Sequence, residues 1–224
     1  NYHKHIHCGE GGVLVTNDDH LAERLCLIRN HAEAVIRSDD PVQLSNMLGY
    51  NFRMGEIEAA IASVQLTKLQ PRIESRQRVA AELNAGLSSL KGVKVPRVSE
   101  GATHVYYVYG LKLDVDELGV SRERLIEALR AEGVPSLMAG YQNLHMLPMF
   151  RHKIAYGTSG FPWNSPYCTS DVQYGPGLCP TAEKLHNETF LGLNICMNEL
   201  PTADVNLIVE AFHKVWSQLD QLKS

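Results

Sequence analysis

The chain has 224 residues, of which 44% are hydrophobic and 21% are charged, and its net charge is -4 at pH 7. A chain of this length can bury a core in one large or two small domains, and its composition argues against disorder. The negative charge argues against general binding to nucleic acid or to a membrane surface. No run of about 18 apolar residues is present to span a membrane.

The five cysteines are scattered along the chain, and none of them forms a CxxC motif. They are Cys8, Cys26, Cys168, Cys179 and Cys196. An odd number of cysteines without a regular spacing argues against a disulfide framework or a zinc site. Free thiols in a reducing compartment are expected, which predicts a cytoplasmic protein.

The amino-terminal stretch places one lysine among histidines, ahead of a glycine-rich turn. Lys4 stands between His3 and His5, and residues 9–12 read Gly-Glu-Gly-Gly. The apolar run Val13–Val15 predicts a short strand after the turn. A lysine on such a strand–turn unit can form a Schiff base with an aldehyde cofactor, because an imine requires a primary amine that can lose its proton. Pyridoxal 5'-phosphate (PLP) is the cofactor that proteins usually hold in this way.

The histidines of the same stretch support a different hypothesis. His3, His5 and His7 alternate, so an extended backbone would carry them on one face, and imidazoles are common metal ligands. A metal-binding module is therefore an alternative, with Cys8 and Glu10 as the nearest further ligands. The PLP hypothesis, without a metal, is preferred because it explains the lysine and the turn together.

Periodicity and breakers predict the elements of the first 90 residues. Two aspartates begin a helix over residues 18–30, because acidic side chains favour the positive end of a helix dipole. Residues 32–47 have no period and predict a loop. A strongly periodic helix is predicted over residues 54–70, and its alanines predict close packing, as at a dimer contact. Pro71 is expected to interrupt the pattern at or just after the end of this helix. A second helix is predicted over residues 73–90.

The remaining residues predict a smaller α+β unit. Strands are predicted over residues 93–95, 104–113, 134–138 and 191–197. Helices are predicted over residues 121–133, with Ser121 as the cap, over residues 180–190, and after Thr202 as the cap of the last helix. The last helix carries an apolar stripe that predicts core packing, formed by Val205, Val209, Phe212 and Trp216. The segment between Phe150 and Pro180 is irregular and rich in aromatic residues. Such a loop can grip a sugar or nucleotide ring, or it can form an interface.

Three blocks of sequence occur in a fixed order. They are Lys4 with Gly9–Gly12 and Thr16-Asn17-Asp18; Gly49-Tyr50-Asn51-Phe52-Arg53-Met54 with Glu56 and Ala59-Ala60-Ile61; and Tyr141-Gln142-Asn143-Leu144-His145-Met146-Leu147-Pro148. Together they resemble blocks of the DegT/DnrJ-type sugar aminotransferases. These are fold-type-I PLP enzymes that act mostly on nucleotide-linked keto-sugars.

The resemblance implies an α/β fold in two parts. Residues 1–78 would be the carboxy-terminal part of the PLP-binding large domain, and residues 79–224 would be a smaller α+β domain. Family members are much longer, and their first half supplies the phosphate-binding loop, the aromatic that stacks on the cofactor and the aspartate that pairs with its ring nitrogen. The chain is therefore expected to be a carboxy-terminal portion of a larger enzyme.

The resemblance also implies roles for individual residues in cofactor binding. Lys4 would be the catalytic residue and would hold PLP as an aldimine. Asn51 and Arg53 would reach across a homodimer interface to the partner subunit's cofactor phosphate, which suits their N–H groups. The residues alone leave another interpretation open, in which Arg53 only forms an ion pair with Glu56 near the helix start.

The same resemblance assigns substrate binding to Tyr141 and His145, and His3 is also expected to bind substrate. The loop that carries Tyr141 and His145 would hold the substrate or approach the cofactor, and His3 would line the pocket. The residues alone also allow Tyr141 and His145 simply to pack against their own domain.

The function predicted on this basis is transfer of an amino group from glutamate or glutamine to a keto-sugar, which we expect to be nucleotide-linked. The amino donor would displace Lys4 from PLP, and the freed amine would move a proton between the substrate and the cofactor as general base and acid. A non-catalytic or incomplete relative of the family stays open as an alternative, as does the metal-binding module.

Overall fold

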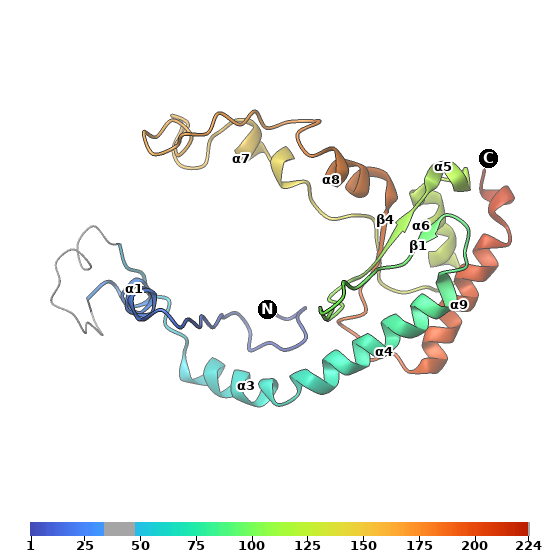
Figure 1. Cartoon of the computed structure of the whole chain (residues 1–224), viewed down its shortest axis with the longest axis horizontal. Coiled ribbons are helices and arrows are strands. Elements are labelled where there is room, and N and C mark those ends of the chain that lie inside the picture. Colours follow the sequence, from blue (N-terminus) through green and yellow to red (C-terminus); the bar gives the residue numbers. More distant parts are fainter. Residues whose placement is uncertain (34–47, 224) are drawn as a thin grey trace. The chain divides into compact units, whose positions relative to one another are not determined.

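The computed structural model describes residues 1–33 and 48–223. The chain divides into two compact units, an amino-terminal unit, Asn1–Arg72, and a carboxy-terminal unit, Ile73–Ser224. The division falls inside one helix, α4 (Leu69–Leu87), which is labelled in Figure 1. The predicted boundary after residue 78 lies on the same helix, and the assignment of the two parts to a large and a small domain stays a prediction.

Two helices precede α4 in the described part of the amino-terminal unit. α1 (Asp19–Arg29) begins where two aspartates predict it, because Asp18 Oδ1 accepts the backbone N–H of Leu21 at 3.0 Å. α3 (Glu56–Leu66) follows Gly55 and contains Glu56 and Ala59-Ala60-Ile61 of the second sequence block. Most of the loop predicted over residues 32–47 lies outside the described residues.

The strand predicted over Val13–Val15 is not formed. The three side chains are 78%, 75% and 91% exposed, and no segment within residues 1–33 or 48–223 pairs with them. A strand needs a neighbour that takes up its backbone N–H and C=O groups. The apolar run matches the sequence pattern of a strand, but this pattern does not specify a neighbouring strand.

The start of α4 differs from the prediction by one turn. The helix begins at Leu69 rather than at residue 73, so that Pro71 lies in its first turn. A proline is tolerated there because the first N–H groups of a helix have no intrahelical acceptor. Pro71 therefore marks a helix start and not an interruption.

The described part of the carboxy-terminal unit contains a four-stranded antiparallel sheet with the order β1-β2-β4-β3. Its strands are β1 (Val93–Lys94), β2 (Tyr109–Leu113), β3 (Leu137–Met138) and β4 (Phe190–Leu193). β2 and β4 lie at the centre, with Tyr109 opposite Leu193 in their register. β1, β2 and β3 each occupy part of a predicted range, and β4 begins one residue before its predicted range.

The strand predicted over residues 104–113 is shortened at its beginning. Tyr106 has a positive φ of 49°, which is uncommon for a residue other than glycine, and its N–H is bound by Nδ1 of His104 at 2.8 Å. A local bond from a side chain to the backbone competes with the ladder of a sheet. The regular strand therefore starts only at Tyr109.

Helices and single turns connect the strands of this sheet and follow the last of them along the chain. They are α5 (Val115–Leu118), α6 (Arg122–Ala131), α7 (Pro148–Arg151), α8 (Pro180–Lys184) and α9 (Thr202–Trp216), with 3₁₀ turns at Leu144–Met146 and Leu219–Leu222 and a π turn at Leu185–Thr189. The cap predicted for α6 is confirmed, because Ser121 accepts the N–H of Arg124. The helix predicted over residues 180–190 is shorter, since Phe190 already begins β4.

The prediction that Thr202 caps the last helix, α9, is wrong. Pro201 is the N-cap residue, and Thr202 is the first helical residue. The Thr202 hydroxyl donates to Oε1 of Glu82 at 3.0 Å instead of capping its own helix. The predicted apolar stripe is confirmed as core packing, because Val205, Phe212 and Trp216 are buried.

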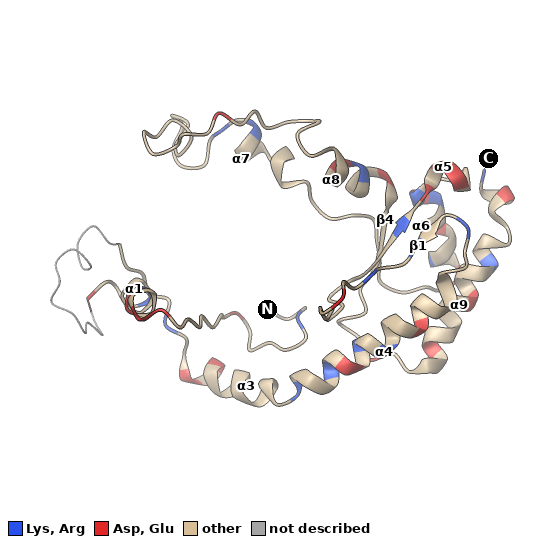
Figure 2. Ribbon diagram, in the orientation of Figure 1, with Lys and Arg blue, Asp and Glu red and all other residues tan. Residues whose placement is uncertain are grey.

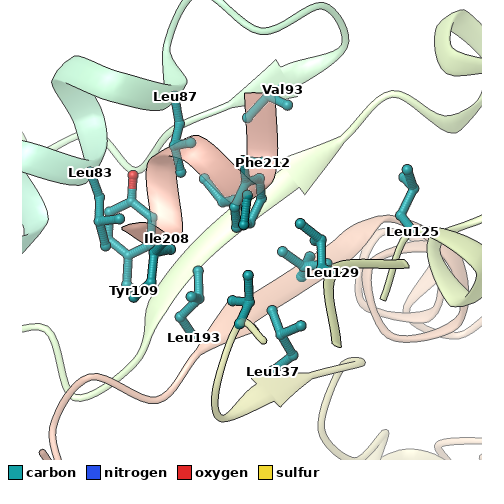
Figure 3. Close-up of a cluster of buried hydrophobic side chains, with 14 of the residues drawn as sticks. Leu83, Leu87, Val93, Tyr109, Leu125, Leu129, Leu137, Leu193, Ile208 and Phe212 are labelled. Carbon is teal, nitrogen blue, oxygen red and sulfur yellow. The ribbon is translucent and has the colours of Figure 1, made fainter. Parts of the chain in front are cut away.

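The core of the carboxy-terminal unit lies between the sheet and helices α4, α6 and α9. Figure 3 shows Leu83 and Leu87 of α4 beside Tyr109 of β2 and beside Phe212 of α9. Leu129 of α6 extends the cluster and is fully buried. Burial of apolar surface on this scale is the main force that stabilises a domain.

Both α4 and α9 carry acidic and basic residues (Figure 2), so neither helix has charges of one sign alone. In the part of the chain that the structure describes, no helix combines the length and the apolar character that crossing a bilayer requires.

Candidate active site

Lys4 lies in an irregular loop of the amino-terminal unit, and its side chain is exposed. The backbone N–H of Lys4 donates to the carbonyl of Asn1 at 3.3 Å. Arg72, in the first turn of α4, donates to the carbonyl of His5 at 2.6 Å. The loop is thus fixed through its backbone while it presents a primary amine at the surface.

The three alternating histidines do not assemble a metal site. Among residues 1–33 and 48–223, no group of three or more histidine, cysteine, aspartate or glutamate side chains is arranged to hold a metal ion. His3 and His5 are half-buried, whereas His7 is exposed. The extended backbone on which the metal hypothesis depended is not formed in this loop.

The second sequence block is tied to the carboxy-terminal end of α1. An isolated antiparallel bridge joins Asn30 to Asn51. Three further backbone bonds flank it: Tyr50 N–H to Ile28 O at 2.7 Å, Phe52 N–H to Arg29 O at 2.9 Å, and His31 N–H to Tyr50 O at 2.9 Å. The rings of Tyr50 and Phe52 stack with their centroids 4.8 Å apart.

Arg53 is oriented by Asn30 and not by Glu56. Its Nη1 donates to Oδ1 of Asn30, and no ion pair joins it to Glu56 among the described residues. The side chains of Arg53 and Asn51 are both exposed. The ion pair that the residues alone allowed is therefore absent, and a guanidinium with further N–H donors stands beside an exposed amide.

These side chains fit the chemistry of PLP. Lys4 offers an exposed primary amine, which an aldehyde requires, and Asn51 and Arg53 offer exposed N–H donors, which a phosphate requires. All three belong to the amino-terminal unit, as does His3, whose N–H donates to Asn1 Oδ1 at 3.4 Å.

The remaining predicted residues belong to the carboxy-terminal unit, where they have different environments. Tyr141 is 83% exposed, whereas His145 is only 9% exposed. His145 Nε2 lies 2.9 Å from Oε1 of Glu183, in α8. His145 is therefore packed and held by a carboxylate, and Tyr141 remains available at the surface.

Glu183 is a residue that sequence reasoning did not identify. Its two carboxylate oxygens accept the N–H of Gly177 at 2.9 Å each, and Oε1 also accepts the N–H of Cys179 at 3.2 Å. The Gly177 N–H is the largest cause that lowers the pKa of Glu183; His145 and Cys179 also lower it, and desolvation opposes them. The sequence offered only an acidic residue in a first helical turn, because its partner His145 is 38 positions away.

The aromatic residues between Phe150 and Pro180 pack partly on one another. Phe150 and Trp163 meet edge to face with centroids 6.0 Å apart, and Tyr174 lies 5.3 Å from Phe150. The indole N–H of Trp163 donates to the hydroxyl of Tyr174 at 3.4 Å. These three rings form an internal cluster, whereas Tyr167 is 93% exposed.

Comparison with known sequences finds one family model and curated relatives that resemble this chain. The sequence model of the DegT/DnrJ/EryC1/StrS aminotransferase family matches residues 1–173. GDP-perosamine synthase of Caulobacter vibrioides is 32% identical over 152 residues, which is 66% of this chain and 39% of the relative. A pleiotropic regulatory protein of Geobacillus stearothermophilus is 32% identical over 144 residues, which is 63% of this chain and 36% of the relative.

The fold is also found in solved structures. DesV of S. venezuelae, determined in complex with a ketimine intermediate, superimposes with a TM-score of 0.68 at 22% identity, over 90% of this chain and 46% of that chain. The chain spans less than half the length of each of these proteins. The α/β fold expected from the sequence blocks is confirmed by this similarity.

Proposed function

Because the chain belongs to the DegT/DnrJ/EryC1/StrS aminotransferase family, whose members depend on PLP, we propose that the protein is a PLP-dependent sugar aminotransferase. The observation that carries the proposal is the family match over residues 1–173, which contains Lys4 and the block with Asn51 and Arg53. The similarity to a GDP-perosamine synthase supports a nucleotide-linked keto-sugar as acceptor and a role in sugar biosynthesis. We take glutamate or glutamine as the amino donor.

In this proposal the side chains divide the chemistry between them. PLP, when bound, supplies an aldehyde that captures amines and a conjugated ring that accepts electrons from the substrate. Lys4 Nζ would bind that aldehyde and, once released, would move a proton as general base and acid. Asn51 and Arg53 would donate N–H groups to a cofactor phosphate. His3, Tyr141 and His145 would bind the substrate.

The proposed homodimer is supported by the surface of α3. None of the residues of this helix is buried, although Ile57, Ile61 and Val64 recur at helical spacing and are 74%, 43% and 57% exposed. An apolar stripe of this kind is typical of an interface. Asn51 and Arg53 stand just before α3, so a dimer formed there would bring them to the partner subunit. The five free cysteines are compatible with the cytoplasm.

The direct test is to trap the cofactor. The purified protein is titrated with PLP, reduced with borohydride, digested and mapped by mass spectrometry. We expect one pyridoxyl group on Lys4, lost in Lys4→Ala and retained in Lys68→Ala, which removes another exposed lysine of the same unit. Labelling that persists in Lys4→Ala, or that spreads evenly over the lysines, would refute the assignment.

A second candidate, a regulatory relative without catalysis, is favoured by the similarity to the pleiotropic regulatory protein. The same experiment separates the two candidates. The aminotransferase predicts that glutamate or glutamine removes the label when it is added before borohydride, because the donor displaces Lys4. A regulatory relative predicts either no specific label or a label that these amino acids leave unchanged.

A further inference from the structure

The carboxylate of Glu183 joins three parts of the carboxy-terminal unit. It belongs to α8, it accepts N–H groups from Gly177 and Cys179 in the preceding turn, and it lies 2.9 Å from Nε2 of His145. The side chains of His145 and Glu183 are only 9% and 18% exposed. A contact this sheltered from water holds its partners more firmly than a surface ion pair does.

The donors around Glu183 determine which way the hydrogen bond to His145 runs. The two backbone N–H groups can only donate, so they favour the ionised carboxylate, which can only accept. His145 Nε2 must then carry the proton in that contact. In the neutral ring this leaves Nδ1 as an acceptor, which suits a hydroxyl group and does not suit a phosphate or carboxylate oxygen.

The other end of the same loop is braced by the π turn that follows α8. Gly140 has a φ of 81°, and a Cβ on it would lie 2.7 Å from the carbonyl oxygen of His186 and 2.9 Å from His186 Nδ1. The buried guanidinium of Arg122 in turn donates to the carbonyls of His186 at 2.6 Å and Asn187 at 2.9 Å. The turn is therefore fixed, and it leaves room only for glycine at residue 140.

We propose that Glu183 is a positioning residue that fixes His145 as an Nε2–H donor and holds the loop Gly140–Leu147 between α8 and the π turn. Glu183 acts through His145 and does not itself contact substrate. The inference rests on the proposed substrate-binding role of His145 and Tyr141. It is tested without PLP or turnover, so it can fail while the Lys4 label is found, and the reverse is also true.

The test is nuclear magnetic resonance of the chain labelled with ¹⁵N at histidine, at a pH where the ring is neutral. Two-bond proton–nitrogen spectra distinguish a protonated ring nitrogen from an unprotonated one. We expect His145 to show a protonated Nε2 and an unprotonated Nδ1. In Glu183→Gln the amide has one acceptor oxygen for three donors, so we expect a mixture of tautomers and at least tenfold faster hydrogen exchange at the Gly177 and Cys179 amides.

Glu188→Gln is the matched control, because Glu188 is an exposed glutamate on the π turn. It should change neither the His145 spectrum nor the two amides. Slow hydrogen exchange in β4 (Phe190–Leu193) verifies that Glu183→Gln remains folded. If Glu183→Gln does not fold, two other measurements test the proposal. They are the tautomer of His145 in the wild type and the hydrogen exchange of Gly140→Ala, which should be faster in the loop Gly140–Leu147. A wild-type His145 protonated on Nδ1, or an unchanged tautomer in folded Glu183→Gln, would overturn the proposal.

Discussion

The guanidinium of Arg53 donates to the side-chain carbonyl of Asn30, so a cation proposed to bind phosphate is oriented by the residue that ends α1. Asn30 also pairs with Asn51 through a backbone bridge. One residue at the end of one helix therefore places both proposed phosphate donors. This arrangement reduces the conformational freedom that Arg53 would otherwise lose on binding.

Removal of Arg53 should weaken cofactor binding. A hydrogen bond to a charged group contributes about 1.5–3 kcal/mol, so Arg53→Ala should lower the affinity for PLP by roughly 10- to 150-fold. Absorbance titration of the purified protein measures the effect. Arg29→Ala is the control, because Arg29 is exposed at the same end of α1 and the substitution keeps its backbone carbonyl, which accepts the N–H of Phe52. Equal losses in the two variants would contradict a specific role for Arg53.

Gly86 of α4 packs against Val209 of α9, and this contact should make a Gly→Ala substitution at residue 86 destabilising. Gly→Ala inside a helix usually stabilises by about 1 kcal/mol. Here the new Cβ would lie 2.6 Å from both methyl groups of Val209. We therefore expect Gly86→Ala to destabilise by about 1–3 kcal/mol, because the α4–α9 contact becomes overpacked.

Urea unfolding of Gly86→Ala, Val209→Ala and the double variant forms a double-mutant cycle. The double variant should lose less stability than the sum of the two single variants, because Val209→Ala removes the methyl groups that clash. A Gly86→Ala protein that is more stable than the wild type would show that α9 yields and that helix propensity dominates.

Local signals in the sequence were sufficient where one segment determines its own structure. The cap at Ser121 and the periodic stripe of Val205 and Phe212 are properties of single helices, and both are confirmed. The strands are less predictable, because each depends on a partner that sequence periodicity does not specify. Val13–Val15 lacks one in the described chain, and Tyr106 binds its neighbour His104 instead.

In the candidate site, too, the sequence predicts the residues of local blocks but not those that depend on a distant partner. Lys4, Asn51 and Arg53 stand in contiguous blocks, so a short pattern was enough to select them, although their roles stay proposals. Glu183 could not be selected, because its significance arises from a contact with His145, 38 residues earlier. A residue that acts by orienting another is visible only once the fold brings the two together.

A charge on the exposed stripe of α3 should prevent dimer formation. Ile61 lies within the stripe of Ile57 and Val64, and a glutamate there would be buried without a partner in the proposed interface. Ile61→Glu should therefore shift the mass measured by light scattering from dimer to monomer. Ser63→Glu is the control, because Ser63 is exposed on a different face of the helix. A dimer that survives Ile61→Glu would exclude α3 from the interface.

Tyr109 should make stability sensitive to alkaline pH. It is fully buried in β2 and donates its hydroxyl to Asn84 Oδ1 at 2.8 Å. Burial raises the pKa of Tyr109, with a smaller contribution from Tyr106, whereas an unfolded tyrosine has a pKa of about 10. Because the folded pKa is the higher one, the stability that this group contributes is complete below pH 10 and is lost as the pH rises toward the folded value.

The comparison of wild type with Tyr109→Phe isolates this effect. At pH 8 the variant should be less stable by about 1 kcal/mol, because the bond to Asn84 is lost. Above pH 10 the wild type should lose about 1.4 kcal/mol per pH unit relative to the variant, so the difference between them should shrink and then reverse. Urea unfolding between pH 8 and about 11.5 measures it. Tyr167→Phe is the control, because Tyr167 is 93% exposed, and its free energy of unfolding should follow that of the wild type at every pH. If the free energy of unfolding of Tyr109→Phe also runs parallel to that of the wild type, the buried hydroxyl does not govern alkaline unfolding.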